Sequence, residues 1–200
     1  MAKFETNMGF VRAIASWQPI TKNASGSLSL ENIAMMDDGG DILITATDRY
    51  RLIYARVRPT HMETWEGKKL FPMSVFTDSV TMNKTIKDFE RVVFDMPDDE
   101  TTYTVTIAGK MVTYDTPTAS YPKLEDLLSD WKSAETWPND NKLNMKLLAD
   151  LSKFADPNVG VATAAKRDYG WIMTLGETRA IRFHQGNMDQ FGVLFMTMKY

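Results

Sequence analysis

Apolar and polar residues follow one plan three times along the chain: a helical period of about 3.6 residues, then alternating, strand-like stretches. The first round opens with an extended segment at residues 3–6. Residues 7–17 then have the helical period, and Phe10, Ile14 and Trp17 fall on one side of the predicted helix. The pattern therefore predicts an amphipathic helix with this side buried.

Capping and turn residues set the limits of these elements. Asn7 is a suitable N-cap for the first helix, and Pro19 is expected to end it. Strands are predicted next at residues 28–36, 41–46 and 51–58. The first two are separated by Asp37-Asp38-Gly39-Gly40, whose composition is typical of a hairpin turn.

The second round begins near Leu70, and Pro72 occupies a position that the first turn of a helix accepts. The apolar arc of this helix is expected to comprise Val75, Met82, Ile86 and Phe89. Strands are predicted after it at residues 91–96, 101–108 and 111–115. The alternation in Thr101-Thr-Tyr-Thr-Val-Thr-Ile107 is strict, so this segment is the clearest strand of the chain.

A polar connector at about residues 129–141 precedes the third round. A helix is predicted over residues 142–155, ending at Asp156-Pro157. Its apolar face comprises Leu143, Leu147, Leu151 and Phe154. Strands are expected at residues 159–164, 170–175, 179–184 and 192–198. Because the helices are too few for a doubly wound sheet, the predicted fold class is α+β with antiparallel sheets.

The composition agrees with this predicted fold and excludes several kinds of functional site. The chain has 200 residues, 44% of them hydrophobic, and a formal net charge of −3, as expected of a protein with a sizeable core. It has no Cys and two His, which excludes disulfides, thiolate zinc sites and most His-based triads. No apolar run approaches the roughly 20 residues that span a bilayer. We therefore expect a cytoplasmic protein with no membrane partner.

Standard catalytic motifs are missing from the sequence: there is no phosphate-binding glycine loop, no His-Glu-x-x-His and no Gly-x-Ser-x-Gly. Carboxylates cluster at residues 37–41 and 98–100, and both clusters lie at predicted hairpin tips, where the turn itself favours Asp. We therefore expect no enzyme, no catalytic residue, no metal and no cofactor.

Basic side chains lie away from the apolar side of all three predicted helices. They are Arg12, Lys84, Lys142, Lys146 and Lys153. A lysine face is usually only a solvated surface. However, basic side chains recur on all three helices of a chain that is acidic overall. This recurrence also fits three helices that face one shared polyanion, for which a phosphate backbone is the obvious candidate. Since no helix has polar residues suited to reading bases, double-stranded DNA is expected to be bound without sequence preference.

The most distinctive segment is Ala46-Thr-Asp-Arg-Tyr-Arg-Leu52, where one predicted strand breaks and the next resumes. It resembles, at five of seven positions, the Ala-Thr-Asp-Gly-His-Arg-Leu motif of the bacterial β sliding clamp family, the DNA polymerase III β subunits. Three further segments resemble that family in the same order: Lys3-Phe4-Glu5 with the first helix, Tyr121-Pro122 with Leu127-Leu128, and Val193–Tyr200.

The resemblance implies a DNA-clamp-like fold, with antiparallel sheets outside and amphipathic helices that line a channel. Residues 1–129 would correspond to the middle domain of the family. Residues 130–200 would form a connector and a partial domain that corresponds to the second half of the last domain. A shortened, phage-encoded clamp fits this division.

In the family, a cleft between the middle and last domains binds partner peptides. Carried over residue by residue, the cleft implied here comprises Thr47, Arg49, Tyr50, Arg51, Leu52, Leu127, Leu128, Ser129, Leu194, Met196, Thr197 and Met198. Leu and Met side chains form adaptable apolar pockets for peptides with Leu or Phe anchors. Arg49 and Thr197 depart from the family's Gly and Pro, and the terminal Lys-Tyr departs from its Arg-Leu. The alternative is that Met196 and Met198 are only core residues of a last strand.

The function implied by the resemblance is that of a DNA sliding clamp, a processivity factor that encircles duplex DNA and tethers a replicative polymerase. The expected partners are double-stranded DNA, peptides of the DNA polymerase and of the clamp loader, and further copies of the chain in a homo-oligomeric ring. Two alternatives stay open. One is a clamp-derived protein that does not encircle DNA and instead occupies host clamp partners or the host clamp. The other is a structural or enzymatic protein that resembles clamps by chance.

Overall fold

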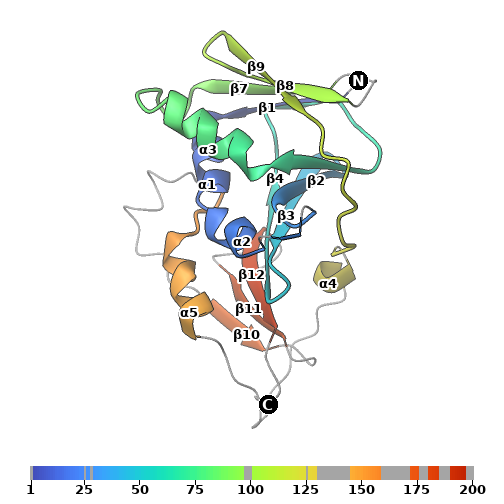
Figure 1. The fold of residues 1–200 in the computed structure, drawn as a ribbon, viewed down its shortest axis with the longest axis vertical. Coiled ribbons are helices and arrows are strands. Elements are labelled where there is room, and N and C mark those ends of the chain that lie inside the picture. The colour runs from blue at the N-terminus through green and yellow to red at the C-terminus, as the bar shows by residue number, and fades with distance from the viewer. Residues whose placement is uncertain are drawn as a thin grey trace.

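The structure, a computed structural model, describes most of the chain (Figure 1). The described residues are 2–24, 26–27, 29–96, 101–124, 126–129, 145–158, 172–175, 180–184 and 190–196. The strands are β1 (Ala2–Asn7), β2 (Asn32–Asp38), β3 (Asp41–Thr47), β4 (Arg51–Val57), β5 (His61–Met62), β6 (Lys68–Pro72), β7 (Arg91–Met96), β8 (Thr102–Ile107), β9 (Lys110–Asp115), β10 (Ile172–Leu175), β11 (Ala180–His184) and β12 (Phe191–Met196). The helices are α1 (Met8–Ala15), α2 (Gln18–Asn23), α3 (Met73–Met82), α4 (Asp126–Ser129), α5 (Met145–Leu148) and the 3-10 helix η1 (Ala149–Lys153).

Two antiparallel sheets organise the molecule. One has five strands in the order β5-β1-β7-β8-β9, and the other has seven in the order β10-β11-β12-β4-β3-β2-β6. The predicted α+β class with antiparallel sheets is confirmed. Strand β12 pairs with β4, and Leu194 lies opposite Leu52 in that register. The last strand therefore continues the sheet of the first round.

The core lies between the two sheets and the helices that cover them. Phe4 of β1 stacks on Phe94 of β7 with ring centroids 4.6 Å apart, and Phe71 of β6 meets Phe94 edge-on at 5.7 Å. Phe10 and Ile14 of α1 are buried against this cluster, as the helical period predicts. The aromatic side chains therefore join strands of both sheets to α1.

Trp17 connects the first round of the chain to the third. Its side chain is fully buried, its indole stacks on Phe191 of β12 at 6.1 Å, and its Nε1–H donates to the carbonyl of Ala155 at 3.0 Å. A Cβ at Gly192, the next residue of β12, would come within 2.5 Å of the Tyr54 hydroxyl oxygen, so only glycine fits there. The C-terminal strand is thus packed as core.

Several local predictions are confirmed. The Asn7 side chain accepts a hydrogen bond from the N–H of Phe10 and caps α1. Gly39 and Gly40 both have positive φ, +69° and +94°, which a two-residue hairpin turn between β2 and β3 requires. Residues 102–107 form β8, with every second side chain buried.

The first predicted helix is present as α1, and a second helix that the sequence did not predict follows it. Helix α1 ends at Ala15, and a second helix, α2, begins at Gln18. Pro19 lies in the first turn of α2, where its missing N–H costs nothing, so the expectation that Pro19 ends the first helix is wrong.

The second predicted helix is shorter than its apolar period. Helix α3 ends at Met82, and Asn83 caps it by donating from Nδ2 to the carbonyl of Ser79 at 2.9 Å. The turn that follows supplies its backbone carbonyls to the first N–H groups of α1. Met82 and Phe89, predicted on the buried arc, are exposed by 57% and 75%, so that part of the prediction is wrong.

The third predicted helix is one α-helical turn, α5, followed by the 3-10 helix η1 that ends at Lys153. Leu151 and Phe154 are buried, as their apolar spacing predicts. Residues 142–144 and the predicted strand 159–164 lie outside the described residues. Strand β2 begins at Asn32 rather than at residue 28, and the pattern missed β5 and β6.

Among the described residues, no helix has both the length and the apolar character needed to cross a bilayer. Figure 1 shows α1, α3 and α5 along one side of the molecule and α4 on the opposite side. These two sides carry different candidate residues.

Candidate functional site

The turn between β3 and β4 is closed by its own polar side chains. The Thr47 hydroxyl donates to the carbonyl of Arg51 at 2.8 Å and accepts from the N–H of Arg49 at 3.2 Å. Asp48 Oδ1 accepts from the N–H groups of Tyr50 and Arg51 at 3.1 and 3.0 Å. Short Thr and Asp side chains favour such local bonds. The Thr-Asp pair therefore fixes the shape of this turn.

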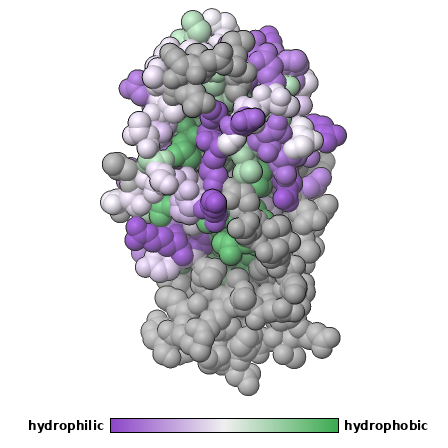
Figure 2. Space-filling model, turned by 90° about the vertical axis from the view of Figure 1, so that its right-hand side faces the viewer, coloured by the Kyte–Doolittle hydropathy of each residue, from purple (hydrophilic) through white to green (hydrophobic). Residues whose placement is uncertain are grey.

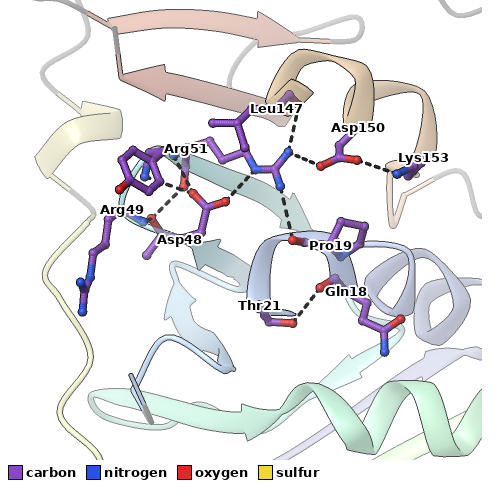
Figure 3. A network of polar contacts seen from close by, with 11 residues as sticks. Gln18, Pro19, Thr21, Asp48, Arg49, Arg51, Leu147, Asp150 and Lys153 are labelled. Carbon is purple, nitrogen blue, oxygen red and sulfur yellow. Dashed lines mark hydrogen bonds and ion pairs between the residues drawn. The ribbon is translucent and has the colours of Figure 1, made fainter. Parts of the chain in front are cut away.

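Arg51 connects the turn to the third round of the chain (Figure 3). Its Nε donates to Asp48 Oδ2 at 2.9 Å. Its Nη1 donates to the carbonyl of Leu147 at 3.0 Å and to Asp150 Oδ2 at 2.8 Å. The side chains of Arg51 and Asp48 are completely enclosed, and that of Asp150 is 13% exposed. A buried charge needs partners of this kind, so the three residues form one unit.

Two further contacts hold the Arg51 guanidinium. Its Nη2 donates to the carbonyl of Pro19 at 3.3 Å, and its plane lies 5.5 Å from the centroid of the Phe154 ring. The Leu147 carbonyl accepts from Arg51 where a continuous α-helix would use it for the N–H four residues on. The predicted helix changes to 3-10 geometry directly after this residue.

Asp150 is shared between two cations. It accepts from Arg51 and, through Oδ1, from Lys153 Nζ at 2.6 Å. Partial burial acts to raise the pKa of Asp150, but the hydrogen bonds and charges of Lys153 and Arg51 outweigh it and hold that pKa below its usual value. The carboxylate is therefore ionised throughout the neutral range.

A separate group of apolar side chains, called the second cluster below, packs beside this turn. It comprises Leu43, Leu52, Tyr54, Leu124, Leu128 and Leu194, with Met36 and Tyr121 at its margin. It brings together β3, β4, β12 and the segment that includes α4. The Tyr121 hydroxyl donates to the carbonyl of Thr45 at 3.3 Å, which binds that segment to β3.

The second cluster has an enclosed floor and an exposed rim. Leu52 and Leu194 in the floor are 4% and 3% exposed. Tyr50 and Leu127 are 55% and 49% exposed, and Arg49 is exposed as well; these three residues are called the rim below. Figure 2 views the side of the molecule that carries α4 and shows hydrophobic residues in small patches among hydrophilic ones. Exposed apolar side chains beside an apolar floor are a common feature of peptide-binding surfaces.

The residues of the expected peptide cleft fall into three groups. The first group comprises Leu52, Leu128 and Leu194, which belong to the second cluster, and Arg49, Tyr50 and Leu127, which are exposed and lie close to its members in the sequence. The second group, Thr47 and Arg51, is buried in the turn. Thr47 is 6% exposed and Arg51 is 1% exposed, so neither offers a ligand much surface. For the third, the side chains of Ser129 and Met196 and all of Thr197 and Met198 lie outside what the structure describes.

The expected DNA-binding residues also have different environments. Arg12 pairs with Asp88 and donates to the carbonyls of Ile86 and Asn83, so its guanidinium holds the turn after α3. Lys84 is exposed in that turn rather than on the helix. Lys146 and Lys153 are exposed on α5 and η1, and Lys142 lies outside the described residues.

The acidic hairpin tip has a structural role, as the turn chemistry predicts. Asp38 pairs with Arg56 at 2.6 Å, and Asp41 pairs with Arg58 at 2.7 Å. Both ion pairs join the β2–β3 hairpin to β4 or to the residue that follows it.

Sequence reasoning missed Asp48 and Asp150, which hold Arg51, and Leu124 and Tyr54 in the floor of the second cluster. Leu124 precedes Leu128 by four residues, a spacing that places both on one side of a helical turn. No local signal marks Asp150, because its partner is 99 residues away in the sequence.

No protein-family model and no curated protein sequence matches the chain. Solved structures do match it. A DNA polymerase III subunit beta sliding clamp from Bartonella birtlesii aligns with a TM-score of 0.65 and 11% identity over 99% of this chain and 65% of the clamp. A DNA polymerase III beta subunit from Thermotoga maritima aligns with a TM-score of 0.67 and 10% identity over 98% of this chain and 64% of that subunit.

A DNA polymerase sliding clamp from Pseudomonas aeruginosa gives the same picture, with a TM-score of 0.64 and 12% identity over 99% of this chain and 65% of the clamp. The chain therefore has the sliding-clamp fold over nearly its whole length, and it spans just under two thirds of each clamp that it matches.

Proposed function

We propose that this protein is a DNA sliding clamp, which encircles duplex DNA and tethers a replicative polymerase and other partners through short peptides. The observation that carries the proposal is the likeness to DNA polymerase III beta clamps across 99% of the chain. In this role the protein binds DNA in the cytoplasm and performs no chemistry of its own.

The side of the molecule with α1, α3 and α5 is the proposed DNA-facing side. Exposed Lys84, Lys146 and Lys153 come from this side and supply positive charge for phosphates. Arg12 contributes indirectly, because it holds the turn that presents Lys84. Contacts of this kind ignore sequence and weaken steeply with salt.

A triple substitution tests the DNA-facing side. Lys142→Glu, Lys146→Glu and Lys153→Glu together should reduce retention on nicked circular DNA after loading without unfolding the protein, because the two described lysines are exposed. A modest fall in melting temperature is expected, because Lys153→Glu replaces a cationic partner of Asp150 with a like charge. Lys110→Glu, on the exposed strand β9 of the five-stranded sheet, is the control. Undiminished retention of the triple variant would show that α5 and η1 do not face DNA.

Encirclement requires self-association, because one copy spans only 65% of the clamp that it matches. The same shortfall favours one alternative: a clamp-like protein that does not encircle DNA and instead occupies the partners of another clamp. Sedimentation equilibrium at micromolar concentration separates the two. A mass of several times 22.7 kDa fits a ring, and a mass of 22.7 kDa fits the alternative.

The rim and the second cluster are the proposed peptide site. Leu or Phe side chains of a bound peptide contact Leu127 and Tyr50 at the rim. They pack above the apolar floor of the second cluster. The pairing of Leu52 with Leu194 supports this assignment, since it joins the two sequence segments that resemble the clamp cleft.

Adjacent leucines of α4 offer a matched test of the peptide site. Leu127→Ala should lower the affinity for a Leu- and Phe-containing peptide several-fold and leave stability nearly unchanged, because Leu127 is 49% exposed. Leu128→Ala should lower the free energy of unfolding by about 2–4 kcal/mol, because Leu128 is 6% exposed. Isothermal titration and urea denaturation measure the two effects. Equal peptide affinity for wild type and Leu127→Ala would place the peptide elsewhere.

A further inference from the structure

Arg49 differs from every other arginine that the structure describes. Ion pairs hold five of the others: Arg12 with Asp88, Arg51 with Asp48 and Asp150, Arg56 with Asp38, Arg58 with Asp41, and Arg91 with Glu5. Arg182 is buried with its guanidinium over the Tyr54 ring. Within the described part of the chain, the Arg49 guanidinium makes no ion pair and no hydrogen bond, and it is exposed to solvent.

The backbone at Arg49 adopts a conformation that arginine disfavours. Its φ is +76°, in the left-handed region, where a Cβ costs roughly 1–2 kcal/mol. The Thr47 hydroxyl and the Asp48 carboxylate hold the turn in this shape through the N–H groups of Arg49, Tyr50 and Arg51. Strain that the surrounding hydrogen bonds maintain is a common feature of binding sites.

The turn places this unpaired cation beside apolar surface. Figure 3 shows the Arg49 side chain leaving the turn on the side away from the Asp48–Arg51–Asp150 network. Leu52, three residues on, packs with Leu124 and Leu128 in the second cluster, so the turn adjoins the segment that carries exposed Leu127. A guanidinium at the edge of an apolar surface favours a ligand with a carboxylate close to its apolar anchors.

We propose that Arg49 selects acidic peptides: the ligand of the rim carries an Asp or Glu within one or two residues of its Leu or Phe anchors. This inference rests on the proposed peptide site and names its class of ligand. An exposed arginine and carboxylate gain only a modest free energy, which corresponds to a preference of about two- to fivefold. Salt screens such a pair, so the preference shrinks as ionic strength rises.

Two peptides of equal length test the proposal, one with Asp beside its Leu and Phe anchors and one with Asn in that position. The affinity of each is measured by titration calorimetry at low and high salt with wild type, Arg49→Gln and Lys110→Gln. Arg49→Gln removes the charge and keeps the Cβ. Lys110→Gln removes an exposed charge from β9 of the five-stranded sheet, to which neither β3 nor β4 belongs. Melting curves of both variants check that the fold is intact.

The expected result is that wild type and Lys110→Gln prefer the Asp peptide about two- to fivefold at low salt, and that Arg49→Gln binds both peptides equally. Equal affinity of wild type for the two peptides overturns the role of Arg49 and leaves the peptide site standing. A preference that persists in Arg49→Gln also overturns it and assigns the preference to another cation. Binding of neither peptide overturns the peptide site together with this inference.

Discussion

Arg49 and Arg51 are two residues apart in one turn, yet the two sides of that turn differ in nearly every physical respect. Arg51 is enclosed, contacts two carboxylates and two carbonyls, and lies against the Phe154 ring. Arg49 is exposed, without a partner for its guanidinium among the described residues, and has a left-handed backbone. The inner side is built for stability and the outer side is available for a ligand.

The contrast shows that a buried arginine and an exposed arginine have different roles in this turn. Burying an arginine is costly unless acceptors surround its guanidinium, and Arg51 has two of its four acceptors, the Leu147 carbonyl and the Asp150 carboxylate, from the third round of the chain. An exposed arginine needs no partner for folding, so Arg49 is free to serve recognition. Three substitutions separate these roles, with effects on stability that decrease from the inner to the outer side.

Removal of Arg51 should have the largest effect. Arg51→Ala leaves Asp48 enclosed without its counter-charge and frees the third round from the turn, so the free energy of unfolding should fall by about 3–5 kcal/mol. Urea denaturation followed by tryptophan fluorescence measures this loss. A loss below about 1 kcal/mol would show that the network contributes little and that apolar packing alone holds the turn.

Asp150→Asn should have a smaller effect, because Asp48 remains with Arg51. The expected loss at neutral pH is about 1.5–3 kcal/mol, the range for a hydrogen bond to a charged group. The pKa of Asp150 is lowered in the folded state, so at acidic pH the unfolded chain binds more protons and wild type loses this contribution as pH falls below about 4. The difference between wild type and Asp150→Asn should therefore shrink in acid, as pH-dependent denaturation can measure. A constant difference would contradict this.

Arg49→Gly should have the smallest effect and the opposite sign. Glycine relieves roughly 1–2 kcal/mol of left-handed strain and costs about 0.5–1 kcal/mol of added freedom in the unfolded chain, which leaves a gain of about 0–1.5 kcal/mol. Thermal melting beside wild type measures it. Destabilisation by this substitution would mean that the Arg49 side chain contributes contacts to the folded state.

The sequence predicts the features that depend on local chemistry well and the site in part. Asn7, Gly39 and Gly40 act through local chemistry, and the alternation of residues 102–107 reads directly as a strand. Phe89 shows the limit, because its helical spacing continues past the point where Asn83 ends α3. The period alone does not reveal that the following backbone is used to cap another helix.

The parts of the site that the sequence does not reveal depend on contacts between residues far apart in the chain. The Ala46–Leu52 segment indicates a cleft only through its resemblance to clamps, whereas the enclosure of Arg51 depends on Asp150, which has no marked neighbourhood in the sequence. The floor likewise depends on β12 pairing with β4 across a long stretch of chain. That pairing brings Leu194 beside Leu52 in the floor.

The outer side of the turn and α4 together are proposed to receive a peptide. Amide chemical-shift mapping of the 22.7 kDa chain during titration with the Asp-containing peptide tests it most directly. Saturable shifts are expected at Arg49, Tyr50 and Leu127, with β9 unaffected. Shifts confined to other surfaces, such as the cavity of about 660 Å³ lined by α2 and the start of α3, would contradict it.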